Sequence, residues 1–141
     1  MTDPLYTRDI LRLAAAIPGQ VGFRDLPDAA ELRSPTCGSR LAMRVSLDAD
    51  GRVATIEQAV EACAFGQASA ALVGQGAAGM DADRARIALA QVQAWLSDET
   101  APLPNWPGID ALIPARSKRG RHGAILLPFR ALVEAIRVAG A

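Results

Sequence analysis

The side chains of this sequence with the most specific chemistry are two cysteines and one histidine: Cys37, Cys63 and His122. A cysteine thiolate binds metal ions and attacks sulfur, and a neutral imidazole is a common metal ligand. In a reducing compartment, two cysteines 26 positions apart are more typical of free thiols or metal ligands than of a structural disulfide. The residue types suggest a Cys2His metal site, and they equally fit two small buried hydrophobes and a surface histidine.

Each cysteine is predicted at the boundary of a structural element. Cys37 lies in the segment Ser34-Pro35-Thr36-Cys37-Gly38-Ser39, where proline and glycine let the backbone approach a bound atom closely. Cys63 directly precedes a predicted helix, whose N-terminal partial positive charge favours the thiolate. His122 stands just before the last predicted helix, and its role as a ligand depends on whether the fold brings it to the cysteines.

The first half of the chain is predicted to form a helix followed by a small antiparallel sheet. Apolar residues predict a helix over residues 5 to 16, which ends before Pro18-Gly19. Residues 40 to 47 alternate between apolar and polar side chains, as a half-buried strand does. After a turn at residues 48 to 51, a second strand is expected from Val53 through Ile56 and a short third one from Gln58 to Ala62.

The second half is predicted to be helical. A helix of small residues begins at Phe65 and ends by Gly79, and Asp81 is expected to cap the next helix, which contains Ala85 to Leu96 on one apolar face. Residues 98 to 121 are rich in proline and predict a long surface connection. A last amphipathic helix covers residues 125 to 136, with Pro128 tolerated near its start. This order predicts one α+β domain over residues 1–141, with about three antiparallel strands packed against helices.

Composition excludes several classes of function. The chain has 141 residues, of which 15 are basic and 15 acidic, so no overall charge attracts nucleic acid or an anionic membrane. Its polar start is unlike a secretory signal, and the uncharged stretch from Ala62 to Met80 is too weakly apolar to span a bilayer, so a cytoplasmic location is expected. No glycine pattern that cradles phosphate follows a strand, and the single histidine leaves no hydrolase triad.

The connection before the last helix contains a cluster of basic residues. Arg116, Lys118, Arg119 and Arg121 follow one another closely, with no aromatic residue among them. Because single-stranded nucleic acid is held by aromatic stacking as well as by charge, we interpret the cluster as a solvated charged face.

Three segments together resemble a known family. Pro35-Thr36-Cys37-Gly38-Ser39 is similar to a Pro-x-Cys-Gly-Asp loop, and Ala62 to Ala70 is similar to a Gly-Cys-x-x-x-x-Ala-Ser segment that leads into a helix. Pro114-Ala115-Arg116 and residues 121–132 resemble a tail of the form Pro-x-Arg, then x-x-Cys-Ala-x-Leu-x-Trp-x-x-Leu. The chain therefore resembles the iron-sulfur cluster assembly scaffolds of the NifU N-terminal type, the IscU and SufU family. The long basic loop is more similar to the SufU type.

The resemblance implies a SufE/NifU-like fold and a site for iron, a transient Fe-S cluster or zinc. In the family, three cysteines, an aspartate and in the IscU type a histidine hold the cargo. Here Gly123 takes the place of the third cysteine and Ser39 that of the aspartate, so the implied ligands are Cys37, Cys63 and His122. A site with three protein ligands is open or takes a fourth from a partner, since four are the norm for zinc and for [2Fe-2S] clusters.

The resemblance also implies partners and a functional class. Sulfur comes from a cysteine desulfurase, and the finished cluster passes to apo-protein acceptors. We expect a scaffold or carrier rather than an enzyme, with Cys37 and Cys63 binding the cluster. The alternative is a diverged sulfur-relay or regulatory module that has lost cluster assembly and accepts sulfur on a cysteine.

Overall fold

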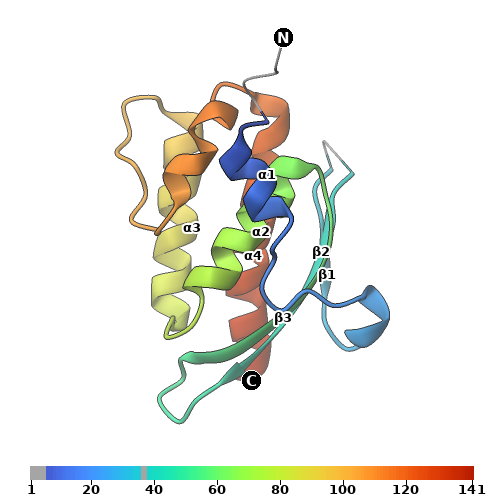
Figure 1. Cartoon of the computed structure of the whole chain (residues 1–141). Helices are drawn as coiled ribbons and strands as arrows, with labels where there is room; N and C mark the ends of the chain where they lie inside the picture. Colours follow the sequence, from blue (N-terminus) through green and yellow to red (C-terminus); the bar gives the residue numbers. More distant parts are fainter. Residues whose placement is uncertain (1–5, 36–37) are drawn as a thin grey trace.

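The computed structural model describes residues 6–35 and 38–141 of the chain, and it has an α+β architecture. A three-stranded antiparallel sheet packs against helices on one face (Figure 1). The strands are β1 (Glu31–Arg33), β2 (Arg40–Leu47) and β3 (Val53–Glu61), and the α-helices are α1 (Arg8–Ala14), α2 (Ala64–Gly76), α3 (Ala82–Ser97) and α4 (His122–Ala139). Three short 3-10 helices complete the order: η1 (Phe23–Asp25), η2 (Ile109–Ala115) and η3 (Arg119–Arg121). The predicted fold class is confirmed.

The sheet differs from the prediction in its set of strands. The strands lie in the order β1-β2-β3, and β3 is one continuous strand where we expected two. Glu57 does not interrupt it, because this residue lies opposite Arg44 and accepts a hydrogen bond from its guanidinium at 2.8 Å. The third strand is β1, whose three residues are too few to show an alternating pattern in the sequence.

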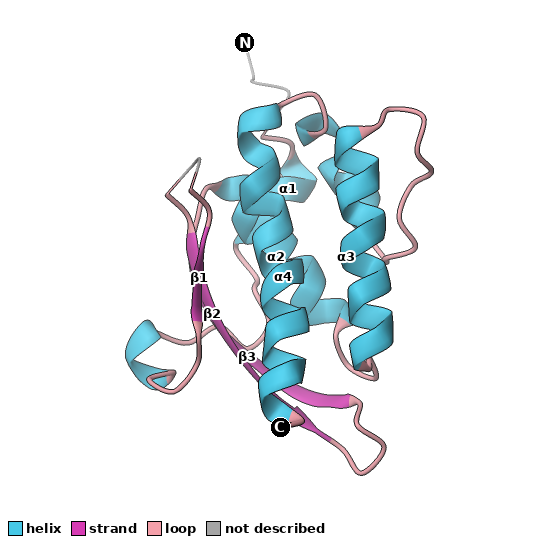
Figure 2. Ribbon diagram, turned by 180° about the vertical axis from the view of Figure 1, so that it is seen from behind, coloured by secondary structure: helices cyan, strands magenta, loops and turns pink. Residues whose placement is uncertain are grey.

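The two faces of the sheet are covered by different parts of the chain. Leu41, Met43 and Val45 of β2 point into the main core against the helices, as their alternation predicts. The opposite face holds a small cluster of Leu26, Ala42 and Ala59, because the segment after α1 crosses to this side (Figure 1). Figure 2 shows the helical layer from behind, with α4 against the sheet and α3 farther from it.

The helix of small residues is the centre of the helical layer. α2 packs between α1 and α4 and ends at Gly76, three residues before the predicted end. Asp81 caps α3 as expected, since its carboxylate accepts a hydrogen bond from the backbone N–H of Arg84 at 2.8 Å. In the described part of the chain, no helix is long and apolar enough to cross a membrane.

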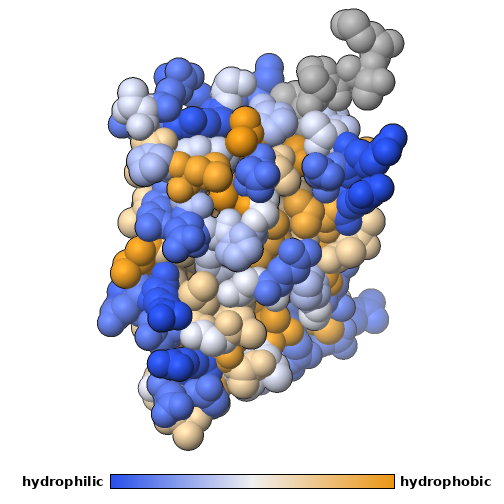
Figure 3. Space-filling view, turned by 60° about the vertical axis from the view of Figure 1, so that its left-hand side comes forward, coloured by the Kyte–Doolittle hydropathy of each residue, from blue (hydrophilic) through white to orange (hydrophobic). Residues whose placement is uncertain are grey.

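We predicted a surface connection over residues 98 to 121, between α3 and α4. This prediction was wrong, because part of the connection is buried. Trp106, Ile109 and Leu112 are buried in the main core. The indole N–H of Trp106 donates to the carbonyl of Leu72 at 2.9 Å, and its ring lies so close to Gly76 that a Cβ there would be 2.7 Å away. Figure 3 shows that the face formed by α3 and this connection is a mosaic of hydrophilic and small hydrophobic patches.

The last helix begins earlier and ends later than predicted. α4 covers His122–Ala139, and Pro128 lies inside it, in the second turn. Because proline has no backbone N–H, the carbonyl of Ala124 loses its usual helical partner there. The early start matters for function, because it makes His122 the first residue of the helix.

Candidate functional site

Cys63 lies where the sheet passes into the helical layer. It follows the end of β3 and is the N-cap residue of α2, with extended backbone angles. Its free thiol is half-buried and makes no capping hydrogen bond to the helix. Cys63 therefore stands directly before the N-terminal end of a 13-residue helix, with its thiol available to a ligand.

The beginnings of α2 and α4 lie side by side. A Cβ built at Gly66 would lie 3.2 Å from the Cβ of Ala124, and the hydroxyl of the buried Ser69 donates to the carbonyl of Ile125 at 2.6 Å. Gly123, which we predicted to take the place of a third cysteine, is therefore in the first turn of a helix that packs against the first turn after Cys63.

Cys37 lies outside the described residues, so its predicted position beside Cys63 remains a prediction. The flanks of its loop are described. The N–H of Ser34 donates to the carbonyl of Ser39 at 2.9 Å, which closes the hairpin between β1 and β2. Directly after it, Arg40 lies opposite Glu61 and binds its carboxylate at 2.9 Å. The hairpin thus extends from the end of the sheet at which β3 leads to Cys63.

Ser39, which we predicted to stand where the family has an aspartate, is 3% exposed. A serine hydroxyl is a poorer metal ligand than a carboxylate because it is hard to ionise. Its burial beside the strand pairing makes Ser39 a part of the hairpin rather than a side chain presented to solvent.

His122 is held by a single defined contact. Its Nε2 lies 2.7 Å from the backbone oxygen of Arg116. A carbonyl oxygen only accepts, so Nε2 carries a proton and donates, and in the tautomer that fits this contact the lone pair is on Nδ1. A backbone carbonyl that orients the second ring nitrogen is a common feature of metal-binding histidines.

Arg116 connects this histidine to α3. Its guanidinium donates from Nε to the carbonyl of Trp95 at 2.7 Å and from Nη2 to that of Asp98 at 2.6 Å, and it lies over the Trp95 ring at 5.2 Å. These bonds satisfy carbonyl groups at the C-terminal end of α3. Our interpretation of Arg116 as part of a solvated face was therefore wrong, and the Pro-x-Arg motif was the sequence signal for its role.

The hydrogen bonds at the C-terminal end of α3 favour the ionised form of Asp98. The hydroxyl and N–H of Thr100 donate to Asp98 at 2.6 and 2.9 Å. These hydrogen bonds, with a smaller effect from the charge of Arg116, hold the pKa of Asp98 below its usual value.

His122 faces a polar hollow on the α3 side of the helix. This hollow has a volume of about 590 Å³, and its lining residues are Leu96, Ser97, Glu99, Arg116, Ser117, Arg119 and His122. Cys63 is not among them. Binding of a metal beside Cys63 would therefore require the imidazole to rotate about its side-chain torsions.

Across residues 6–35 and 38–141, no three His, Cys, Asp or Glu side chains lie close enough to hold a metal ion. Cys37 is outside that search, so the ligand set Cys37, Cys63 and His122 remains a prediction. The donor types still fit an open iron or zinc site, because Cys63 offers an uncapped thiol and His122 an unshared lone pair.

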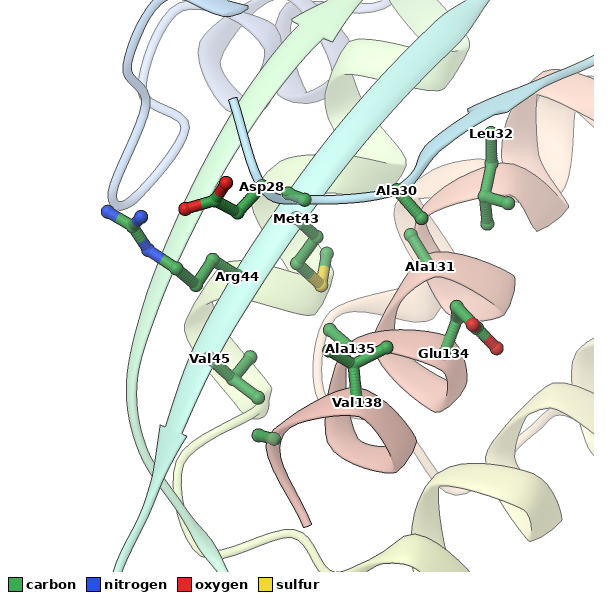
Figure 4. A pocket seen from close by; sticks show the side chains of 12 residues that line it. Asp28, Ala30, Leu32, Met43, Arg44, Val45, Ala131, Glu134, Ala135 and Val138 are labelled. Atoms are coloured by element: carbon green, nitrogen blue, oxygen red, sulfur yellow. The ribbon is translucent and has the colours of Figure 1, made fainter. Parts of the chain in front are cut away.

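A second hollow is apolar and lies between the C-terminal half of α4 and β2 (Figure 4). Its volume is about 220 Å³, and alanines of α4 face Met43 and Val45 across it. Its lining contains neither cysteine nor histidine, so this hollow is separate from the predicted ligands Cys63 and His122.

Comparison with solved structures gives close matches over nearly the whole chain. The N-terminal NifU-like protein from Brucella abortus, described as nitrogen-fixing, is 28% identical, covers 96% of this chain and 94% of its own, and has a TM-score of 0.82. A putative iron-sulfur cluster assembly scaffold protein for the SUF system from Fervidobacterium islandicum AW-1 is 17% identical, with a TM-score of 0.73 over 94% of this chain and 96% of its own. A hypothetical protein is 22% identical, with a TM-score of 0.70 over 94% and 97%. The last two likenesses concern the fold alone.

The sequence itself gives the stronger statement of relationship. A search of curated proteins gives no significant match. The family model of the NifU-like N-terminal domain matches residues 5–108, which include both cysteines, the whole sheet and helices α1 to α3. This chain belongs to the NifU-like N-terminal domain family.

Proposed function

We propose that this protein is an iron-sulfur cluster assembly scaffold, which holds iron or a nascent cluster as its cargo through Cys37 and Cys63. The proposal is carried by the position of Cys63: an uncapped, half-buried thiol at the start of α2, beside the start of α4 and at the end of the sheet from which the Cys37 hairpin extends. Membership of the NifU-like N-terminal domain family and likeness to the NifU-like protein from Brucella abortus support it.

In this proposal, each residue has a defined role. Cys37 and Cys63 bind iron, or zinc in a resting form, as thiolates. His122 supplies Nδ1 after its ring turns toward the cysteines, and Gly123 leaves one position open for a solvent molecule or a ligand from a partner. Such an open site suits cargo that must leave for an apo-protein acceptor.

The test is anaerobic reconstitution with ferrous iron and sulfide. The wild-type protein should acquire visible charge-transfer absorption and bound iron, whereas Cys37→Ser and Cys63→Ser should acquire neither. His122→Ala should retain the absorption but lose iron faster to a chelator. A wild-type protein that binds no iron would overturn the proposal.

A second function is favoured by the two replaced positions, Ser39 and Gly123, which leave fewer ligands than a cluster normally has. In a sulfur relay, the Cys63 thiolate attacks the outer sulfur of a persulfide on the cysteine desulfurase. The new S–S bond forms on Cys63 as the donor's S–S bond breaks, and the electron pair leaves with the donor's thiolate. Incubation with desulfurase and L-cysteine should then add one sulfur atom to the mass of this chain, without metal.

Both functions describe a carrier that works as one domain in the cytoplasm and turns over no substrate of its own. Elemental analysis of protein purified without added metal separates them. Zinc or iron near one atom per chain favours the scaffold, whereas persulfide without metal favours the relay.

A further inference from the structure

Charges are unevenly distributed along this electrically neutral chain. No acidic residue occurs between Asp110 and Glu134, while this stretch contains five basic ones: Arg116, Lys118, Arg119, Arg121 and Arg130. Three of them, Lys118, Arg119 and Arg121, lie in or next to η3, and we call them the basic turn. The neutrality of the whole chain therefore hides a local positive field.

The basic turn forms no ion pair within the described part of the molecule. Lys118 and Arg119 are exposed and Arg121 is half-buried, and none of the three side chains has a hydrogen bond or ion pair to a described residue. Some other arginines are paired within the fold: Arg40 and Arg44 of the sheet and Arg137 of α4 each pair with a glutamate. Fixed cations without partners are available to a second molecule.

The basic turn lies at the same end of the molecule as Cys63. η3 passes directly into α4, and the first turn of α4 packs against the first turn of α2 at Gly66 and Ala124. Figure 1 shows the starts of both helices and the β1–β2 hairpin at this end. A molecule that contacts the basic turn is therefore placed beside the cysteine end.

The chemistry of the surroundings favours a protein over a nucleic acid. Proteins that hold single strands add aromatic platforms to their basic grooves. Here no aromatic residue occurs between Trp106 and Phe129, and both of those rings are buried.

We infer that the basic turn is the docking surface for an acidic face of the protein that delivers sulfur to the cysteine end. This inference rests on the proposed function, and its partner is a cysteine desulfurase. Opposite charges at such a rim increase the rate of encounter and make it sensitive to salt.

Lys118 makes the inference directly testable, because it is the only lysine in the chain. A carbodiimide condenses an amine with a carboxylate in direct contact, so docking on an acidic face should join Lys118 to an Asp or Glu of the desulfurase. The probe is the purified desulfurase encoded in the same genome, and peptide mapping separates Lys118 from the N-terminal amine. Lys118→Arg keeps the charge and removes the amine, so it should abolish this cross-link.

Charge reversal tests how much the basic turn contributes to the affinity for the desulfurase. The double variant Arg119→Glu/Arg121→Glu should bind the desulfurase at least tenfold more weakly and with a smaller dependence on salt. The matched control is Arg52→Glu, an exposed residue in the hairpin beyond β2. That hairpin lies near the C-terminal end of α4, and an 18-residue helix is about 27 Å long, so Arg52 is far from the basic turn. The Arg52→Glu variant should therefore change the affinity for the desulfurase less than about twofold.

Cross-linking at Lys118, together with a loss of affinity for the desulfurase in the charge-reversal variant, supports the inference. Cross-links that map elsewhere, unchanged affinity in the double variant, absence of binding, or preferential binding of duplex DNA or RNA would each overturn it. Reconstitution with iron and sulfide contains no desulfurase, so it tests the proposed function independently.

Discussion

Gly66 and Ala124 meet where α2 and α4 begin: a Cβ at residue 66 would lie 3.2 Å from the Cβ of Ala124 and 2.7 Å from that of Ala62. Ala124 lies in α4 and Ala62 in the short connection between β3 and α2, and neither methyl group has a side-chain torsion through which to move away. This close approach holds the first turn of α2, which follows Cys63, against the first turn of α4, which contains Gly123. The geometry of the proposed site therefore depends on the absence of a side chain at residue 66.

Gly66→Ala should destabilise the protein despite the better helix propensity of alanine. The propensity gain is about 1 kcal/mol, whereas overpacking of a close contact costs about 1–3 kcal/mol. We expect a net loss of about 1 kcal/mol in the free energy of unfolding by urea, and a larger loss for Gly66→Val. Gly120→Ala is the control, because a Cβ at that residue has no neighbour within 4 Å. Equal stability of the two alanine variants would contradict the contact.

Arg116→Ala should loosen the corner that holds His122. The variant removes two short hydrogen bonds from a cation to the carbonyls of Trp95 and Asp98, for a loss of about 2–3 kcal/mol in unfolding free energy. Because His122 is the only histidine, its ring nitrogens give unambiguous NMR signals. The wild-type ring should be protonated at Nε2, and the variant should show a mixture of tautomers. Arg116→Lys, which keeps the charge, should lie between them.

Thr100→Val should alter stability in a pH-dependent way. The Thr100 hydroxyl lowers the pKa of Asp98 in the folded protein. The ionised carboxylate therefore stabilises the fold at pH values above the unfolded pKa of this group. That stabilisation is lost as the pH falls through the folded pKa. The variant should therefore be less stable than the wild type at pH 7, and the difference should shrink once the pH falls below the unfolded value near 4. Urea denaturation at pH 7 and pH 3 measures this, and a difference that grows toward pH 3 would refute it.

Gly123→Cys should strengthen metal binding. The variant adds a thiol in the first turn of α4, beside the start of α2, and so restores the third cysteine of the family pattern. We expect zinc affinity to rise by at least tenfold, which corresponds to about 1.4 kcal/mol. Competition with a chromophoric chelator measures the affinity, and Gly123→Ala controls for the effect of a Cβ on the helix. No difference between these two variants would place residue 123 away from the metal.

The sequence determined much of this protein by local rules. β2 has the predicted bounds because alternation over eight residues specifies both a strand and its buried face. Asp81 caps α3 as predicted because capping involves only residues three positions apart. The segments around Cys37 and Cys63, together with the tail from Pro114 to Leu132, were sufficient to indicate the family, since each is a short contiguous motif.

Tertiary structure decided the features that depend on contacts between distant residues. β1 exists through its pairing with β2, and Trp106 is buried because α2 offers Gly76 and the carbonyl of Leu72 to its ring. The direction of His122 is likewise decided by Arg116, which is itself held by the end of α3. Composition and periodicity contain no record of such contacts, because each one joins segments whose separation in sequence has no fixed relation to their distance in the fold.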